Sequence, residues 1–514
     1  MRHLLGRVKG SQIDCFFCCV RISDVREMRD YIAMIGLEVH VQLKTKTKMF
    51  CGCRVEYGAE PNTNVCPVCL GLPGALPVPN AEALRLTALA GLMLGCRIPE
   101  VCKFDRKNYF YPDMPKNYQI SQYDMPFCLG GRVPLHDLAY PKDAQKRIEH
   151  PGKSVGLVRI HLEEDVAKSF HMENASGIDF NRAGTPLLEI VSEPEIANAD
   201  EAFAFLTVLQ QVMVYGGVSD ADMEKGQMRC DVNVSVRPVG SERLGTKIEI
   251  KNLNSISGVR RALVYEIERQ ARVLAGGGGL QQETRRWDDV RGETVLMRTK
   301  ESAHDYRYFP DPDLMPVRTG DFVAAAERRK PELPWEKRER YVKQFGITGY
   351  DAAVLADNLE LAAFFEEAAR GASKPKTVAN YLLNDLLSAL SAAGVAIKES
   401  PLRAEGLREL AEAVDSGRIN SRQGKEVFAE MFATGKGAME IIRERGLEQV
   451  SDAGELEALA ERVIAENPGP AEDYRSGKVA ALNYLKGQVM KLSKGKANPQ
   501  VAGEILARML GGAG

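Results

Sequence analysis

The sequence predicts an α+β protein, because two kinds of hydrophobic pattern occupy different parts of the 514-residue chain. Between about Met34 and Pro316, short runs alternate apolar and polar residues and are separated by many glycine and proline turns. Such alternation is typical of half-buried strands. After Pro334 the composition changes to alanine, leucine, glutamate and lysine at helical spacing. A chain of this length is too long to fold around a single hydrophobic core, so we expect about two to four domains.

We place the domain boundaries where these patterns change. Residues 1–33 are interpreted as a disordered extension, with Met28 as a possible internal start; residues 34–330 form the strand-rich domain, 331–446 a helical domain and 447–514 a helical tail. The apolar run Cys15–Val20 is too short for a signal-peptide core. An organellar targeting peptide is the second interpretation of the extension, because its basic residues outnumber its acidic ones.

Three helices are expected inside the strand-rich domain. One follows the capping residue Asn80 and ends near Gly95, and a second opens at Asp200. A third begins near Ser255 and ends at Gly276–Gly279, which we interpret as a flexible linker. Asparagine, aspartate and serine accept hydrogen bonds from the free N–H groups at helix starts, whereas glycine commonly ends helices.

Five strands carry an unusual polar face. Acidic residues recur there beside histidine, arginine and lysine, although glutamate and aspartate are poor strand formers. The strands are Leu37–Leu43, Val158–Glu163, Leu187–Val191, Asp231–Arg237 and Lys247–Lys251. An ordinary solvated sheet face explains any one of them. All five together favour a sheet whose open face binds cations and phosphate.

Four cysteines have the spacing of a metal site. Cys51 and Cys53 are separated by one glycine, and after twelve intervening residues Cys66 and Cys69 enclose a Pro-Val pair. Two close pairs of thiolates suit a tetrahedral zinc ion with a structural role, because a four-cysteine site leaves no open position for catalysis. Four unrelated buried cysteines are the alternative.

Bulk composition excludes some classes of protein. The net charge of -2 gives no global nucleic-acid signal, so any RNA site must be a local patch. Eleven cysteines without a secretory signal favour a reducing compartment, and we expect a cytoplasmic protein. No apolar run has the length of a membrane span, so no membrane contact is expected.

Several longer motifs resemble one known family. They are Ile35–Leu43, Phe104–Gln119, His161–Asp165, Asp179–Glu189, Lys251–Ser255, His304–Asp313 and Gly495–Pro499. Together they resemble the B subunits of aspartyl/glutamyl-tRNA(Asn/Gln) amidotransferases, over nearly the whole stretch from Met34 to Leu510. The N-terminal extension and a lengthened stretch at Tyr140–Ser154 depart from the family pattern without touching the motifs.

This resemblance implies a fold and a reaction. Residues 34–330 would be a catalytic cradle domain with a mostly antiparallel sheet, similar to the glutamine synthetase and guanidino-kinase group, and with a zinc-ribbon-like insertion. ATP would phosphorylate the side-chain carboxyl of Glu-tRNA(Gln) or Asp-tRNA(Asn), and ammonia from glutamine would then displace the phosphate. The implied partners are an amidase subunit and a small third subunit, which complete a heterotrimer. The other implied partner is tRNA(Gln) or tRNA(Asn), whose elbow the tail 447–514 would bind.

The resemblance also implies roles for individual residues. Phosphoryl transfer from ATP needs a divalent ion on oxygen ligands and cations near the moving charge. The magnesium ligands would be Glu38, His40, Glu163, Glu189, Asp231 and Glu249. Phosphate contacts are expected from Arg159, Arg237, Lys247 and Lys251, although each is equally suited to balance a neighbouring acid. Lys107 and Lys116 would lie where ammonia emerges and act in catalysis.

Two other functions are weighed against this one. The chain could be a non-catalytic tRNA-binding scaffold for an amidase, which the repeated strand acids disfavour. It could also be a small-molecule Mg-ATP ligase of the glutamine-synthetase type, which the basic tail disfavours. That tail carries Arg475, Lys478, Lys486, Lys491, Lys494, Lys496 and Arg508. The sequence does not decide between the glutamine and asparagine routes.

Overall fold

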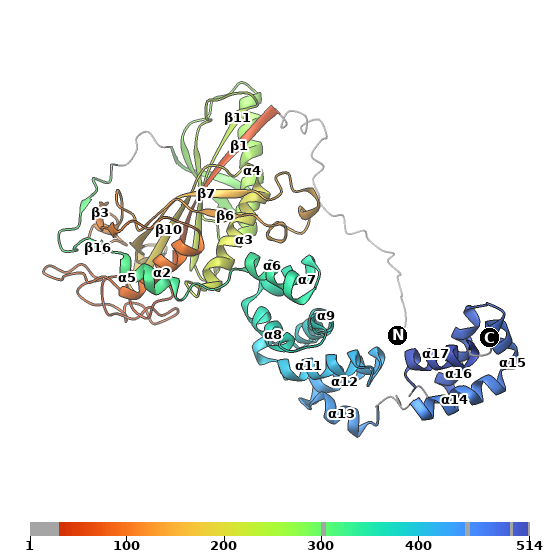
Figure 1. Ribbon diagram of the computed structural model, residues 1–514. Helices are drawn as coiled ribbons and strands as arrows, with labels where there is room; N and C mark the ends of the chain where they lie inside the picture. Colours follow the sequence, from red (N-terminus) through yellow and green to blue (C-terminus); the bar gives the residue numbers. More distant parts are fainter. Residues whose placement is uncertain (1–29, 300–304, 448–452, 494–496, 512–514) are drawn as a thin grey trace, which may run out of the picture. The chain divides into compact units, whose positions relative to one another are not determined.

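The structure is a computed structural model that describes residues 30–299, 305–447, 453–493 and 497–511. It divides into two compact units, one ending at Pro331 and one beginning at Glu332 (Figure 1). Most of the predicted extension, residues 1–29, lies outside the described residues. Its last three residues correct the prediction, because strand β1 (Tyr31–Gln42) begins at Tyr31 and pairs with residues up to Pro238.

A mostly antiparallel nine-stranded sheet forms the first unit. Its order is β14-β13-β12-β11-β1-β10-β7-β5, with β6 also paired to β7, and only β12 and β13 run parallel. The other strands are β5 (Cys128–Leu129), β6 (Arg132–Pro134), β7 (Ser154–Glu164), β10 (Pro186–Ser192), β11 (Met228–Pro238), β12 (Ile248–Lys251), β13 (Glu283–Asp288) and β14 (Glu293–Thr299). The four strands that the alternation predicts are present, and so is the fifth, which the sequence marks as an apolar run with one carboxylate.

The two faces of this sheet differ as the alternation predicts. Along β1, Ile35, Leu37, Val39 and Val41 are fully buried, while Glu38 and His40 on the other face stay partly accessible. Helices α3 (Ala199–Tyr215) and α4 (Ile256–Ala275) pack against one another, and α4 also packs on β11 (Figure 1). The apolar face therefore packs into the core, and the polar face remains partly accessible.

Helix starts follow the expected capping chemistry. Asn80 caps α2 (Ala81–Met93) by accepting hydrogen bonds from Glu82 and Ala83, and Ser255 caps α4. The cap of α3 is Asn198 rather than the expected Asp200, which lies inside the first turn. An acidic side chain there is favourable near the positive end of the helix dipole.

Short strands link distant parts of the first unit. The sheet β15-β3-β4 joins β3 (Asp105–Asn108), β4 (Tyr118–Ser121) and β15 (Phe309–Pro310). Two further pairs are β2 (Val101–Cys102) with β16 (Val317–Arg318), and β8 (Lys168–His171) with β9 (Ser176–Asp179). The 3-10 turns η2 (Asp137–Ala139) and η3 (Gln145–Arg147) and the helix α5 (Gly320–Glu327) complete the unit.

The second unit is helical and contains two separate cores. One core is built from α6 (Pro334–Phe345), α7 (Gly349–Asp357), α8 (Leu359–Ala369), α9 (Pro375–Asn380), the π-helical η4 (Tyr381–Leu386), α10 (Leu387–Ala393), η5 (Ile397–Glu399), α11 (Ala404–Asp415), α12 (Ser421–Thr434) and α13 (Ala438–Glu444). The other is built from α14 (Ala453–Glu466), α15 (Pro468–Arg475), α16 (Ala480–Leu492) and α17 (Pro499–Gly511). None of the helices described is both long and apolar enough to cross a membrane.

Candidate active site and cysteine cluster

The polar face of the large sheet carries a row of side chains across three neighbouring strands. His40 on β1 lies opposite Glu189 on β10, and Glu189 lies opposite His161 on β7. Glu163 lies two residues beyond His161 on the same face of β7. Antiparallel pairing places directly opposed side chains close together, so this register by itself assembles the group.

Short contacts hold this row together. His40 Nε2 lies 3.3 Å from Glu163 Oε1 and 3.4 Å from Glu189 Oε2, and His161 Nε2 lies 3.4 Å from Glu189 Oε2. Burial opposes a charged His40, but the two carboxylates outweigh it and raise the pKa of His40 to about 10. Against the effect of burial, His161 and His40 hold the pKa of Glu189 well below its usual value. The two acids therefore attract positive charge at this point.

The donor set fits a divalent cation. One ligand atom each of His40, Glu163 and Glu189 lie within 4.8 Å of one another. Glu163 Oε2 and His161 Nδ1 are buried, and neither has a hydrogen-bond partner among the residues described. Buried polar atoms without partners carry a desolvation cost, which a bound ion or ligand offsets at the carboxylate. Oxygen ligands from two carboxylates suit Mg²⁺.

The other predicted magnesium ligands lie on the same face but have partners of their own. Asn233 Nδ2 donates to Glu38 Oε1 at 2.8 Å. Lys251 Nζ contacts Asp231 and lies 3.3 Å from Glu249, which also accepts a hydrogen bond from Thr284. The structure therefore groups three of the six predicted ligands, His40, Glu163 and Glu189, around one point.

The predicted phosphate contacts are spread along this face. Arg159 on β7 donates to the carbonyl oxygen of Tyr123 at 2.9 Å, and Arg237 donates to the carbonyl oxygen of Ser241. Lys247 is exposed just before β12. Lys251 balances neighbouring acids, which is the alternative that its spacing left open. Arg159 is the one that shares its strand with His161 and Glu163.

The two predicted catalytic lysines lie on the small sheet and the loop beside it. Lys107 on β3 places its ammonium 5.0 Å from the centre of the Tyr306 ring. Burial alone would lower the pKa of Lys107, but the fields of Glu163, Tyr308 and Glu189 raise it well above its usual value. Lys116 Nζ lies 2.6 Å from Glu164 Oε1, which also accepts a hydrogen bond from the backbone of Ile120.

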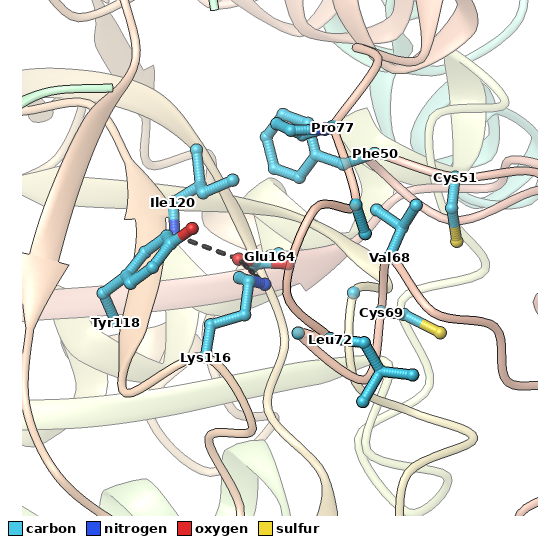
Figure 2. Close-up of a pocket in the computed structure, with 13 residues that line it drawn as sticks. Phe50, Cys51, Val68, Cys69, Leu72, Pro77, Lys116, Tyr118, Ile120 and Glu164 are labelled. Carbon is cyan, nitrogen blue, oxygen red and sulfur yellow. Dashed lines mark hydrogen bonds and ion pairs between the residues drawn. The ribbon is translucent and has the colours of Figure 1, made fainter. Parts of the chain in front are cut away.

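Lys116 and Glu164 form one wall of a pocket of about 90 Å³ (Figure 2). Figure 2 shows their charged groups pointing toward one another, while apolar side chains surround the rest of the space. Its lining includes Phe50, Val68, Leu72, Pro77, Tyr118 and Ile120, with Cys51 and Cys69 at the opposite side. The pocket thus joins a predicted catalytic lysine to the cysteine segment.

The four spaced cysteines converge in space. One sulfur from each of Cys51, Cys53, Cys66 and Cys69 lies within 4.8 Å of the others. Lys48 Nζ donates to Cys69 Sγ at 3.5 Å and to the carbonyl oxygen of Phe180 at 3.2 Å. Cys51, the backbone N–H of Cys66 and Lys48 together lower the pKa of Cys69, against the effect of burial. Four sulfurs at this separation, one favouring the thiolate, fit a tetrahedral metal site.

Two residues of these sites are missing from the predicted set. His161 contacts Glu189 in the row, and its place in the alternating strand was the signal that could have assigned it. Lys48 is fully buried, although its sequence neighbours Lys44 and Lys46 are exposed. No local pattern distinguishes Lys48 from those two, because only the fold brings Cys69 and Phe180 to it.

Comparisons with known proteins agree with the motifs. The family model described as "GatB/GatE catalytic domain" matches residues 33–324, and that described as "GatB domain" matches residues 363–510. A protein of Methylacidiphilum infernorum, named as the B subunit of an aspartyl/glutamyl-tRNA(Asn/Gln) amidotransferase, is 58% identical over 94% of this chain and 99% of its own length. Proteins of the same name from Persephonella marina and Carboxydothermus hydrogenoformans are 50% and 49% identical, over 94% and 93% of this chain and 100% and 98% of their own lengths.

Matched family models cover well over half of the chain, and the similarity extends over nearly the full length of each relative. The chain therefore belongs to the family of aspartyl/glutamyl-tRNA(Asn/Gln) amidotransferase B subunits.

Proposed function

We propose that this chain is the subunit of a tRNA-dependent amidotransferase that activates and amidates the side-chain carboxyl of Glu-tRNA(Gln), Asp-tRNA(Asn) or both. The observation that carries the proposal is the convergence of His40, Glu163 and Glu189 on the open face of the sheet, in a chain of this family. Family membership argues against a free-standing small-molecule ligase. The group of His40, Glu163 and Glu189, here called the cation-binding group, argues against a non-catalytic scaffold.

The proposed reaction has two steps. A side-chain carboxylate oxygen of the aminoacyl group attacks the γ-phosphorus of ATP, the bond to the bridging oxygen breaks, and ADP leaves. The nitrogen of ammonia then attacks the carbonyl carbon of the resulting acyl phosphate, and inorganic phosphate departs with the bonding electrons. Ammonia loses one proton as the amide forms. Positioning and charge stabilisation dominate catalysis of phosphoryl transfer.

Individual residues suit these steps. His40, Glu163 and Glu189 would hold a magnesium ion, which would supply charge neutralisation for the phosphates of ATP. The nearby carboxylates of Glu163 and Glu189 favour the charged form of Lys107. Lys107 would therefore remain an ammonium and contact the transferred phosphoryl group. Glu164, paired with Lys116 at the pocket, would accept a proton from incoming ammonium. The remaining predicted residues, Glu38, Asp231, Glu249, Arg159, Arg237, Lys247 and Lys251, would complete the electrostatics of the same face.

The wider assembly is part of the proposal. Glutamine would be the ammonia donor, an amidase would release and deliver the ammonia, and a small third subunit would complete the heterotrimer. The cluster Cys51, Cys53, Cys66 and Cys69 would hold a structural zinc ion, and residues 447–514 would bind tRNA. The expected likeness to the glutamine synthetase and guanidino-kinase group stays a prediction.

Reconstitution tests the proposal. The chain would be assembled with the amidase and the small third subunit and given Mg-ATP, glutamine and misacylated tRNA, with amidated aminoacyl-tRNA measured as product. We expect Glu163→Gln and Glu189→Gln each to lower kcat at least about 100-fold, because each removes a charge from the cation-binding group. The exposed Glu173→Gln provides the matched control and should retain wild-type activity.

Two outcomes would contradict the proposal. Wild-type rates in both variants would remove the cation-binding group from the mechanism. ATP hydrolysis that proceeds equally well without the aminoacyl-tRNA, with no amide formed, would indicate a different reaction. Glu249→Gln then tests the extent of the metal site, since Glu249 lies outside the group of three.

A further inference from the structure

A row of four tyrosine rings in contact runs beside the candidate active site. The ring of Tyr123 stacks on Tyr308 with centroids 4.3 Å apart and planes only 11° from parallel. Tyr308 meets Tyr306 edge-on at 6.2 Å, and Tyr306 meets Tyr109 edge-on at 6.4 Å. The four rings come from three segments, which the small sheet β15-β3-β4 brings together.

The outer end of this row is open. Tyr123 keeps 52% of its surface accessible although Tyr308 covers one side of its ring. Phe309, next to Tyr308, is 44% exposed, and Phe110 and Tyr111, next to Tyr109, are 73% and 65% exposed. Isolated exposed aromatic side chains are normal on proteins, whereas Tyr123 presents one accessible face of a ring whose other face is held by stacking on Tyr308.

Cationic groups flank the same rings. Arg159 donates to the carbonyl oxygen of Tyr123, and Arg159 lies on the strand that also carries His161 and Glu163. Further along the row, the ammonium of Lys107 lies over Tyr306. The row therefore has an exposed ring at Tyr123, next to Arg159 on the strand that carries Glu163, and a second cation, Lys107, over Tyr306. Aromatic rings beside cations are the combination that binds single-stranded nucleic acids, whose bases stack while their phosphates pair.

We propose that the accessible face of the Tyr123 ring is a stacking surface for the unpaired 3′-terminal base of the tRNA. This inference rests on the proposed function, in which the amino acid that carries the reacting side-chain carboxyl is esterified through its α-carboxyl to the terminal ribose of a tRNA. That ester forces the terminal base to lie within one aminoacyl group of the reaction centre.

A binding cycle on the assembled heterotrimer tests this inference. The probes are uncharged cognate tRNA and the same tRNA lacking its terminal adenosine, and the dissociation constant of each is measured by fluorescence anisotropy. Removing the Tyr123 ring with Tyr123→Leu should weaken binding of the full-length tRNA about tenfold, in line with the stacking of one base on an aromatic ring. Binding of the shortened tRNA should be unchanged, because it lacks the base concerned.

Two controls separate stacking from other effects. Tyr123→Phe keeps the ring and should bind both tRNAs as the wild type does. Tyr350→Leu removes an even more exposed tyrosine from α7 in the helical unit and should change neither dissociation constant. Equal weakening toward both tRNAs would overturn the inference, because the loss would then not depend on the terminal base.

Three further results would also overturn it. A larger dissociation constant for Mg-ATP in Tyr123→Leu, with tRNA binding unchanged, would assign the surface to the adenine of ATP. Failure of Tyr123→Leu to assemble with the amidase and the small third subunit would assign it to a protein partner, and no change in any measurement would leave Tyr123 without this role. These experiments measure binding alone, so their outcome does not depend on amide formation. A wild-type complex that forms no amide would contradict the proposed function and not this inference.

Discussion

Lys116 is largely buried and Lys48 fully buried near the pocket, but different groups balance their charges. The side chain of Lys116 is 11% exposed and pairs with the buried Glu164. Lys48 is completely buried, and its hydrogen bonds in the described structure go to a carbonyl oxygen and a thiol. A buried ammonium needs a nearby negative charge, and thiolates of the cysteine cluster are suited to supply it.

The first prediction concerns Lys48. A zinc ion with four thiolates carries a net charge of about minus two, which the ammonium of Lys48 would partly neutralise. We expect Lys48→Met to weaken zinc retention about 10- to 100-fold in a chelator competition, the usual effect of losing a group that contacts metal ligands. Lys46→Met changes an exposed lysine two residues away and should retain zinc. Equal retention in both variants would exclude the charge-balancing role.

The second prediction concerns Lys116. Lys116→Met leaves the carboxylate of Glu164 buried without its cation, which costs about 3–5 kcal/mol when a buried pair is broken. We expect the apparent Tm of the strand-rich unit to fall by roughly 5–10 °C in a thermal scan. Lys44→Met is the matched control, because Lys44 pairs with Asp220 at the same 2.6 Å but both side chains are more than half exposed.

Exposed ion pairs contribute about 0–1 kcal/mol, so Lys44→Met should shift the Tm by no more than about 2 °C. A second variant, Lys116→Met with Glu164→Gln, should recover most of the lost stability, because no buried charge then remains unpaired. Equal Tm values for Lys116→Met and Lys44→Met would show that Glu164 gains solvent or another partner.

At the scale of elements, the cysteine segment packs directly against the loop that carries Lys116. Gly71 adopts a φ of +67°, and a Cβ there would lie 2.6 Å from Lys116 Cγ and 3.0 Å from Lys116 Cα. Gly74, three residues later, adopts a φ of +84° but would place its Cβ in open space. The two glycines therefore share the backbone requirement and differ in the contact with Lys116.

The third prediction uses this difference. Both Gly71→Ala and Gly74→Ala strain a left-handed backbone, but only Gly71→Ala also displaces Lys116. We expect Gly71→Ala to cost about 1–3 kcal/mol more than Gly74→Ala in the free energy of unfolding, the typical effect of overpacking. Amide formation should fall in Gly71→Ala and stay near wild type in Gly74→Ala. Indistinguishable variants would show that the loop around Lys116 yields without consequence.

Sequence patterns predict some elements far better than others. The period of two identified β1, β7, β11 and β12, because each strand has one face against the core, whereas β10 was identified as a short apolar run with one carboxylate. The small sheet β15-β3-β4 had no such signal, since Asp105–Asn108 pairs with Phe309–Pro310 some two hundred residues later in the chain. Strand order and register follow from pairing across distant segments, which no local pattern encodes.

At the scale of the whole molecule, the chain is built from separately packed cores. The core of α14–α17 consists of its own residues, including Leu456, Leu485 and Leu506, and shares none with the core of α6–α13. Its predicted basic surface is weaker than the sequence suggested, because Arg475, Lys478 and Arg508 pair with Glu472, Asp473 and Glu457. Lys494 and Lys496 lie outside the described residues.

The fourth prediction follows from these separate cores. A chain truncated before α14 lacks only the core of α14–α17. It should assemble with its partners and bind Mg-ATP as the full chain does. Affinity for tRNA should fall about tenfold or more near 0.15 M salt, and the dependence of binding on salt should become shallower because phosphate contacts are removed. Unchanged tRNA affinity and salt dependence would mean that the tail does not bind RNA.

The sequence alone predicted the α+β class, the helical C-terminal region, the metal-type spacing of the cysteines and, through its motifs, the family. Each of these depends on a local feature of the sequence: alternation, composition or the spacing of nearby residues. The tertiary structure decided which of the predicted metal ligands converge, because His40, Glu163 and Glu189 meet only through the register of β1, β10 and β7. It also placed Lys48 against Cys69 and Tyr123 against Tyr308, since contacts between side chains far apart in sequence depend on how the whole chain packs.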